Sequence, residues 1–111
     1  MSKPVSLRSG RDFQRVLTDG RSARRNGIVA VVVAGPKPEE PSRLGLAVRS
    51  TRGAVARNRT KRRLRAAFDE IEVPRGYDVV LRADDEVRAS PFSEVVGHLG
   101  AALAQATERI R

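Results

Sequence analysis

Apolar residues recur along the chain with two different spacings, and this pattern divides it into predicted helices and strands. Helical i, i+3, i+4 spacing marks residues 11–19, which Ser9 can cap and Gly20 can end. Residues 54–68 are good helix formers without Gly or Pro, and an apolar stripe of helical spacing runs along residues 92–110. The pattern therefore predicts three helices, the last one packed against the core.

Strand-like segments fill the gaps between these helices. Residues 28–33 are a β-branched run of strand length, and residues 43–49 alternate between apolar and small or basic side chains. The proline-rich loop at 35–42 between them predicts that the two strands pair as a hairpin. With a third strand at 77–82, the predicted order is α-β-β-α-β-α. It indicates an α/β (α+β) sandwich, with helices on one or more faces of a small sheet.

The length and composition fit a single domain over residues 1–111, in which residues 1–8 form a flexible basic arm. The chain has no Cys and one His, which excludes disulfides, thiolate metal sites and His clusters. It shows neither a signal peptide nor an apolar run long enough to span a membrane, so we expect a cytoplasmic protein. We predict neither a membrane nor a protein partner.

The charge is concentrated in the middle of the chain. Residues 41–68 contain nine basic side chains and no acidic one, whereas the other 83 residues hold 13 of each sign. The net charge of +9 therefore arises in this window alone. A solvated helix face usually mixes both signs, because oppositely charged pairs support a helix. Unmixed charge costs stability, so the pattern favours a polyanion partner over a merely solvated face.

Few residues suggest catalysis by the protein itself. The sequence contains no GxSxG motif, no paired-His motif and no phosphate-binding glycine loop. Asp84, Asp85 and Glu86 could be read as a metal site, but three carboxylates in a turn are more often solvated. His98 has no evident catalytic partner and is interpreted as structural. A basic helix on a small sheet indicates a nucleic-acid-binding surface instead.

The motif RNRTKRRLR, preceded by GAVA and by the strand LGLAV, resembles the signature of the bacterial ribonuclease P protein subunit. DFQRVL in the first helix and YDVVLR in the third strand follow in the same order. The resemblance implies a fold like that of a ribosomal-protein domain, with a left-handed strand-helix-strand crossover. General handedness alone would predict a right-handed one.

The resemblance also implies a function. The protein would bind a catalytic RNA subunit and help it remove the 5′ leader of precursor tRNA, with hydrolysis carried out by the RNA and its magnesium ions. No catalytic or metal-binding side chain is expected in the protein. The residues implied to contact the RNA subunit are Arg49, Arg52, Arg57, Asn58, Arg59, Lys61, Arg62 and Arg65.

A leader-binding cleft is implied between the first helix and the open sheet face. Phe13 matches an aromatic of that cleft, and Leu17, Ile28 and Val31 stand where the family often has further aromatics. The residues alone leave two readings of Phe13 open, a core residue or a platform that stacks on a base. Asn58 can likewise contact RNA or turn inward to a backbone group.

Two other functions remain as alternatives. A ribosomal or general RNA-binding protein would use the same helix without any role in processing. A stand-alone nuclease would use Asp84, Asp85 and Glu86 to hold metal and would cut RNA by itself.

Overall fold

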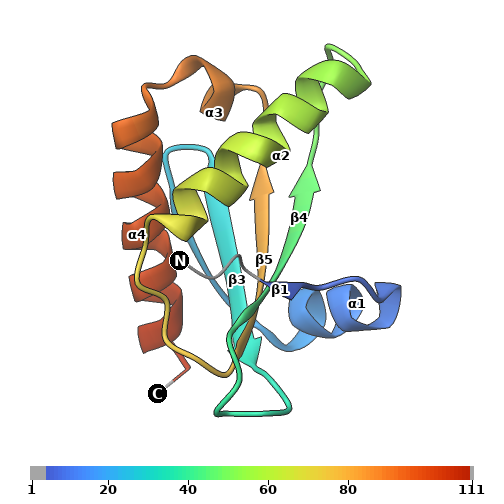
Figure 1. Cartoon of the computed structure of the whole chain (residues 1–111), viewed down its shortest axis with the longest axis vertical. Helices are drawn as coiled ribbons and strands as arrows, with labels where there is room; N and C mark the ends of the chain where they lie inside the picture. Colours follow the sequence, from blue (N-terminus) through green and yellow to red (C-terminus); the bar gives the residue numbers. More distant parts are fainter. Residues whose placement is uncertain (1–4, 111) are drawn as a thin grey trace.

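The computed structural model describes residues 5–110 (Figure 1). The elements along the chain are β1 (Val5–Ser6), α1 (Gly10–Asp19), β2 (Arg21–Arg25), β3 (Ile28–Ala34), β4 (Arg43–Val48), α2 (Ala54–Asp69), β5 (Tyr77–Ala83), α3 (Glu86–Ala89) and α4 (Phe92–Glu108). The mixed α/β class is confirmed. None of the helices within residues 5–110 is both long and apolar enough to cross a membrane.

The sheet has five strands in the order β1-β4-β5-β3-β2. β5 lies at its centre, antiparallel to β3 and parallel to β4. The predicted hairpin between residues 28–33 and 43–49 is therefore wrong, because β5 lies between these two strands. β5 is buried along most of its length, because strands pair with both of its edges and helices pack on both faces of the sheet.

The connection from β4 through α2 to β5 is a crossover between parallel strands. In Figure 1 both strands point upward, α2 passes in front of the sheet, and the chain moves from β4 to β5 on its left. This is the left-handed sense, which few such connections adopt.

The two faces of the sheet are covered differently. On one face α2 and α4 pack over a core that includes Leu44, Val79 and Leu81, and these helices and the sheet form a two-layer sandwich. On the other face α1 covers a smaller apolar cluster around Val16 and Val80. Because α1 is only ten residues long, part of this second face stays open.

The first helix agrees closely with its prediction. α1 spans Gly10–Asp19, Ser9 accepts a hydrogen bond from the backbone N–H of Arg11, and Gly20 is the C-cap. The predicted loose arm over residues 1–8 is wrong for its second half, since Val5–Ser6 pair with β4 and Leu7 is 4% exposed. Residues 1–4 lie outside the described part of the chain.

Two further elements were not predicted. β2 is rich in arginine and is followed by a tight turn in which Asn26 and Gly27 have φ angles of 46° and 84°. It pairs with β3 as a hairpin. α3 is a single turn of four residues. Short elements of this kind carry too few apolar positions to show a period.

Candidate nucleic-acid interface

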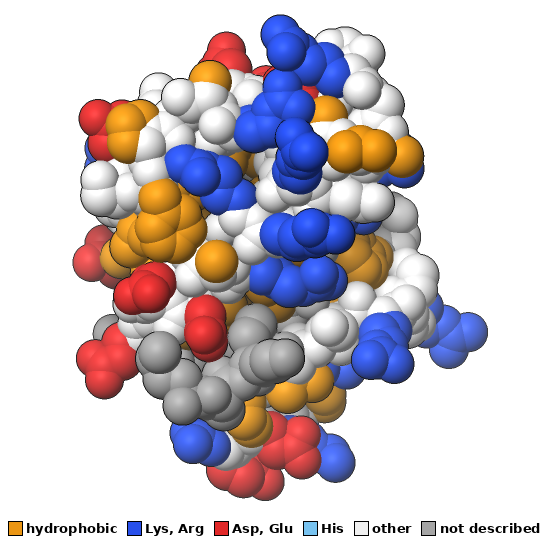
Figure 2. Space-filling model, turned by 45° about the horizontal axis from the view of Figure 1, so that its top comes forward, with side chains coloured by type: hydrophobic (Ala, Val, Ile, Leu, Met, Phe, Trp, Pro, Cys, Tyr) orange, Lys and Arg blue, Asp and Glu red, His pale blue; other side chains and the backbone are white. Residues whose placement is uncertain are grey.

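α2 buries one side and exposes the other. The buried side consists of Ala56, Thr60, Leu64, Ala67 and Phe68, which recur at helical spacing. The exposed side carries the predicted RNA-contacting residues. We call them, together with two arginines of the preceding loop, the basic surface: Arg49, Arg52, Arg57, Asn58, Arg59, Lys61, Arg62 and Arg65. Figure 2 shows a run of Lys and Arg side chains from the top of the view down its middle.

Arg63 is a basic residue of α2 with a different environment. Its guanidinium donates a hydrogen bond to the backbone carbonyl of Ser90 and lies 5.6 Å from the centre of the Phe92 ring. These contacts join α2 to the start of α4. Arg63 therefore has a structural role.

The loop before α2 is held by an aspartate. Asp85 accepts hydrogen bonds from the backbone N–H of Thr51 at 3.2 Å and from its hydroxyl at 3.3 Å. The Ser50 hydroxyl, followed by these two groups, holds the pKa of Asp85 below its usual range. Asp84 in turn accepts from the backbone N–H of Glu86. Among residues 5–110, no group of three or more His, Cys, Asp or Glu side chains could hold a metal ion.

Strand register arranges the face beneath α1 in three rows across β3, β5 and β4. Row one lies at one end of the strands and consists of Val33, Asp78 and Arg43. Row two is covered by α1 and consists of Val31, Val80 and Gly45. Row three is open and consists of Val29, Arg82 and Ala47. α1 approaches row two closely, since a Cβ atom added at Gly45 would lie 2.5 Å from the Phe13 ring.

Row three forms the floor of a groove. One hollow of about 260 Å³ lies over Val29, Ala47 and Arg82, and a second of about 430 Å³ continues past Leu17 of α1 to α2. The two hollows share Ala47, Arg49 and Arg82. We call them together the sheet groove. Its charged residues are five basic side chains and one acidic one: Arg24, Arg49, Arg57, Lys61, Arg82 and Asp84.

The four predicted leader-binding residues have different positions. Leu17 lines the sheet groove and is 38% exposed. Phe13 is half-buried on Gly45, and Val31 is buried beneath α1. Ile28 is wrong as a groove residue, because it is 1% exposed and belongs to the core on the α4 side. Alternate strand residues face opposite sides, so Val29 occupies the groove instead.

Sequence reasoning missed Arg24, Val29, Ala47 and Arg82 as groove residues. They come from four different strands, which are distributed along the chain from β2 to β5. Only the strand register brings them to one face. Alternation along 77–82 could have placed Arg82 opposite the buried Leu81, but it could not identify its neighbours on other strands.

Below α1 four charged side chains alternate in sign, and we call them the charge square: Asp12, Arg15, Arg43 and Asp78. Arg43 donates two hydrogen bonds to Asp78, at 2.8 Å and 2.7 Å, and Arg15 donates another to the same carboxylate. Asp12 completes the square at 3.5 Å from Arg43 and 3.8 Å from Arg15. The square links α1 to β4 and β5.

Asp78 is 1% exposed, so its charge depends on these partners. Burial alone would raise the pKa of Asp78, but the hydrogen bonds and charges of Arg43 and Arg15 outweigh it and hold the pKa below its usual range. The hydrogen bond to Asp78 likewise raises the pKa of Arg43. Both groups are therefore charged at neutral pH.

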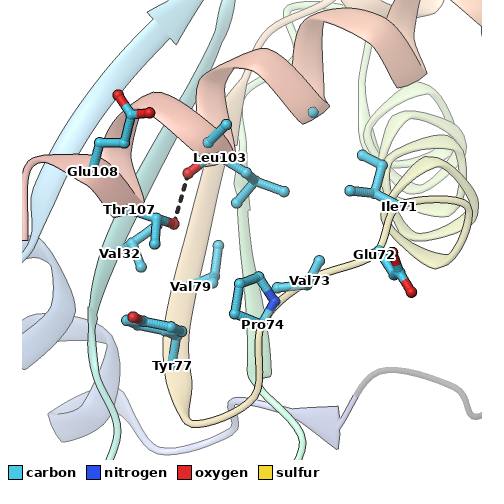
Figure 3. Close-up of a pocket in the computed structure, with 12 residues that line it drawn as sticks. Val32, Ile71, Glu72, Val73, Pro74, Tyr77, Val79, Leu103, Thr107 and Glu108 are labelled. Atoms are coloured by element: carbon cyan, nitrogen blue, oxygen red, sulfur yellow. Dashed lines mark hydrogen bonds between the residues drawn. The ribbon is translucent and has the colours of Figure 1, made fainter.

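A separate apolar pocket of about 250 Å³ lies between α4 and the loop after α2 (Figure 3). Val32, Val79 and Leu103 contribute to its lining. Its charged lining residues are Glu72 and Glu108, and none of its described lining residues is Lys or Arg. Carboxylates repel phosphate, so this pocket does not belong to the candidate nucleic-acid interface.

Comparison with known proteins gives a consistent result. Residues 1–107 match the model of the family described as Ribonuclease P. The ribonuclease P protein component of Gluconacetobacter diazotrophicus is 36% identical over 107 residues, covering 93% of this chain and 91% of the relative. That of Kocuria rhizophila is also 36% identical over 107 residues, covering 93% and 92%. The solved RNase P protein from Thermotoga maritima has a TM-score of 0.76 at 27% identity, covering 90% of this chain and 96% of that structure. The chain therefore belongs to the ribonuclease P protein family.

Proposed function

We propose that this chain is the protein component of ribonuclease P, which binds the RNA subunit and the 5′ leader of precursor tRNA in the cytoplasm. As a family member it takes part in an endoribonuclease complex that matures tRNA 5′ ends. The observation that carries the RNA-binding proposal is the basic surface, on which seven of eight side chains are cationic and all project from α2 or the loop before it.

The basic surface is the proposed contact with the RNA subunit. Arg57, Arg59 and Arg62 are exposed on α2, and the one acidic residue of this helix is its last residue, Asp69. Phosphate contacts by such side chains supply affinity that falls with salt. The RNA partner also accounts for a cluster of like charges that destabilises the free protein.

The sheet groove is the proposed site of the leader. It is open, and its floor contains Val29 and Ala47. Arginines from β2, from β5 and from the end of β4 surround it. Single-stranded RNA is bound by grooves that combine cationic side chains for the backbone with apolar or aromatic surfaces for the bases. Phe13 lies at the buried side of α1, so we assign it to anchoring α1 and Leu17 to the groove wall.

We assign hydrolysis to the RNA subunit and its magnesium ions. The roles of Asp84 and Asp85 support this assignment, because both carboxylates accept hydrogen bonds from backbone groups that define the loops around them. A stand-alone nuclease would need these oxygens for metal ions.

The test is cleavage of precursor tRNA by a ribonuclease P RNA at low magnesium, with and without the protein. We expect the protein to restore cleavage and to cut nothing by itself. A protein that binds the RNA but leaves cleavage unchanged would instead support the ribosomal or general RNA-binding alternative. Cutting by the protein alone would support the nuclease alternative.

A further inference from the structure

The charge square lies beside the wall of the sheet groove without being part of it. Arg43 and Asp78 occupy row one, α1 covers row two, and the groove floor is row three. On α1, Asp12 and Arg15 are one turn apart and face row one, whereas Leu17 faces the groove. The helix therefore has the square on one side and the groove on the other.

Apolar packing holds α1 on the sheet through few residues. Val16 is the one fully buried residue of α1, and Phe13 is half-buried. Because the buried area is small and apolar contacts are non-directional, the position of α1 also depends on its polar contacts. Charge-assisted hydrogen bonds between guanidinium and carboxylate groups are directional and fix the relative position of the groups they join.

We propose that the charge square is a positioning device that fixes the distance between α1 and row three, and with it the width of the sheet groove. Arg15 and Asp12 are thus positioning residues for leader binding, although neither lines the groove. This inference rests on the proposed function of the groove as the leader site.

The charge square should affect leader binding in the sheet groove without affecting binding of the RNA subunit. Its two acidic and two basic side chains cancel in charge, so it adds little to the attraction of RNA as a whole. It also lies on the α1 face of the sheet, whereas α2 packs on the opposite face. Loosening the square should weaken leader binding and leave binding of the RNA subunit unchanged.

The test uses the holoenzyme assembled with ribonuclease P RNA and the variant Arg15→Gln. This change removes the ion pair from α1 to Asp78, but leaves the contact of Asp12 with Arg43 and the two hydrogen bonds from Arg43 to Asp78. Arg11→Gln is the matched control, because it removes the same charge from an exposed residue of the same helix outside the square. Arg15→Lys is the conservative variant, since it keeps a cationic donor for Asp78.

Affinity is measured for precursor tRNA with a leader and for mature tRNA without one. For Arg15→Gln we expect about tenfold weaker binding of the leader-bearing tRNA, which corresponds to about 1.4 kcal/mol. Binding of mature tRNA and of the RNA subunit should be unchanged. Arg11→Gln should bind both tRNAs as the wild type does, and Arg15→Lys should recover part of the loss.

The possible outcomes separate the two proposals. If the wild type binds leader-bearing and mature tRNA equally, the leader function fails and this inference fails with it. If the wild type distinguishes them but Arg15→Gln behaves like Arg11→Gln, the leader function stands and the positioning role is overturned. Equal loss for both tRNAs would also overturn it.

A second variant covers the case in which Arg15→Gln does not fold. Asp12→Asn removes a different corner, at 3.5 Å from Arg43, and Asp12 is 30% exposed. We expect the same leader-specific loss at smaller size, with the cooperative unfolding transition retained. Unchanged leader affinity in this folded variant would overturn the proposal.

Discussion

The basic surface of α2 and the charge square use the same side chain, arginine, in opposite electrostatic settings. The arginines of the basic surface are exposed, and the sequence around them contains no acidic residue from Pro41 to Phe68. In the square each arginine lies between two aspartates, one of which is 1% exposed. Like charges destabilise the free protein and favour a polyanion partner, whereas alternating charges fix one element on another.

Asp78→Ala should have the largest effect on stability. It leaves Arg15 and Arg43 side by side without their shared carboxylate. Breaking a buried pair by removing one partner costs about 3 kcal/mol, and we take this lower limit because both arginines keep part of their side chains exposed. Urea unfolding followed by circular dichroism measures the loss. Affinity of the folded fraction for the RNA subunit should not change, and a change there would contradict the separation of the two regions.

Gly45→Ala should destabilise the protein by about 2 kcal/mol through overpacking. The added Cβ would lie 2.5 Å from the Phe13 ring, so α1 or the ring has to shift. Gly97→Ala is the matched control in α4, where the new Cβ would meet nothing within 4 Å. Alanine should stabilise that helix by about 0.5 kcal/mol or more. Equal unfolding free energies for the two variants would contradict the close packing of α1.

Arg63→Ala and Arg62→Ala should have different effects although the residues are adjacent. Arg63 joins α2 to Ser90 and Phe92, so its loss should lower the free energy of unfolding by about 1 kcal/mol. Arg62 is exposed, and its loss should leave stability within about 0.5 kcal/mol of the wild type. Thermal unfolding of both variants tests this difference. Similar stabilities would contradict the structural role of Arg63.

Acid should reduce the stabilisation of the fold by the charge square, and this loss should be smaller than that caused by the substitutions above. The folded state lowers the pKa of Asp78, so the unfolded chain takes up this proton more readily. The stabilisation is therefore present above the usual aspartate pKa and is lost as the pH falls through the lower pKa of the folded state. Unfolding measured between pH 5 and pH 3 should show a steeper loss for the wild type than for Asp78→Ala. Parallel curves would contradict this linkage.

The sequence predicted long periodic elements well and short ones poorly. α1 with its Ser9 cap and the exposed face of α2 follow from local helical spacing. β1 and β2 were missed because a two-residue strand and an arginine-rich strand have no apolar run. The hairpin was misassigned because the pairing of β3 depends on β5, which follows β3 by more than 40 residues in the sequence.

The same division holds for the candidate site. The basic surface lies on one helix and its preceding loop, so a motif within one segment was enough to find it. The sheet groove and the charge square assemble from several elements through strand register. Choosing Ile28 in place of Val29 shows the consequence, because an offset of one residue in a strand moves a side chain to the opposite face.

The most direct test of the central claim is the salt dependence of binding between the protein and ribonuclease P RNA. In a plot of log affinity against log salt, each phosphate contact contributes a slope of about 0.9 for a duplex or 0.7 for a single strand. We predict that Arg62→Ala weakens binding and reduces the slope by about that amount. An affinity and slope identical to those of the wild type would contradict the assignment of the exposed α2 charges to RNA.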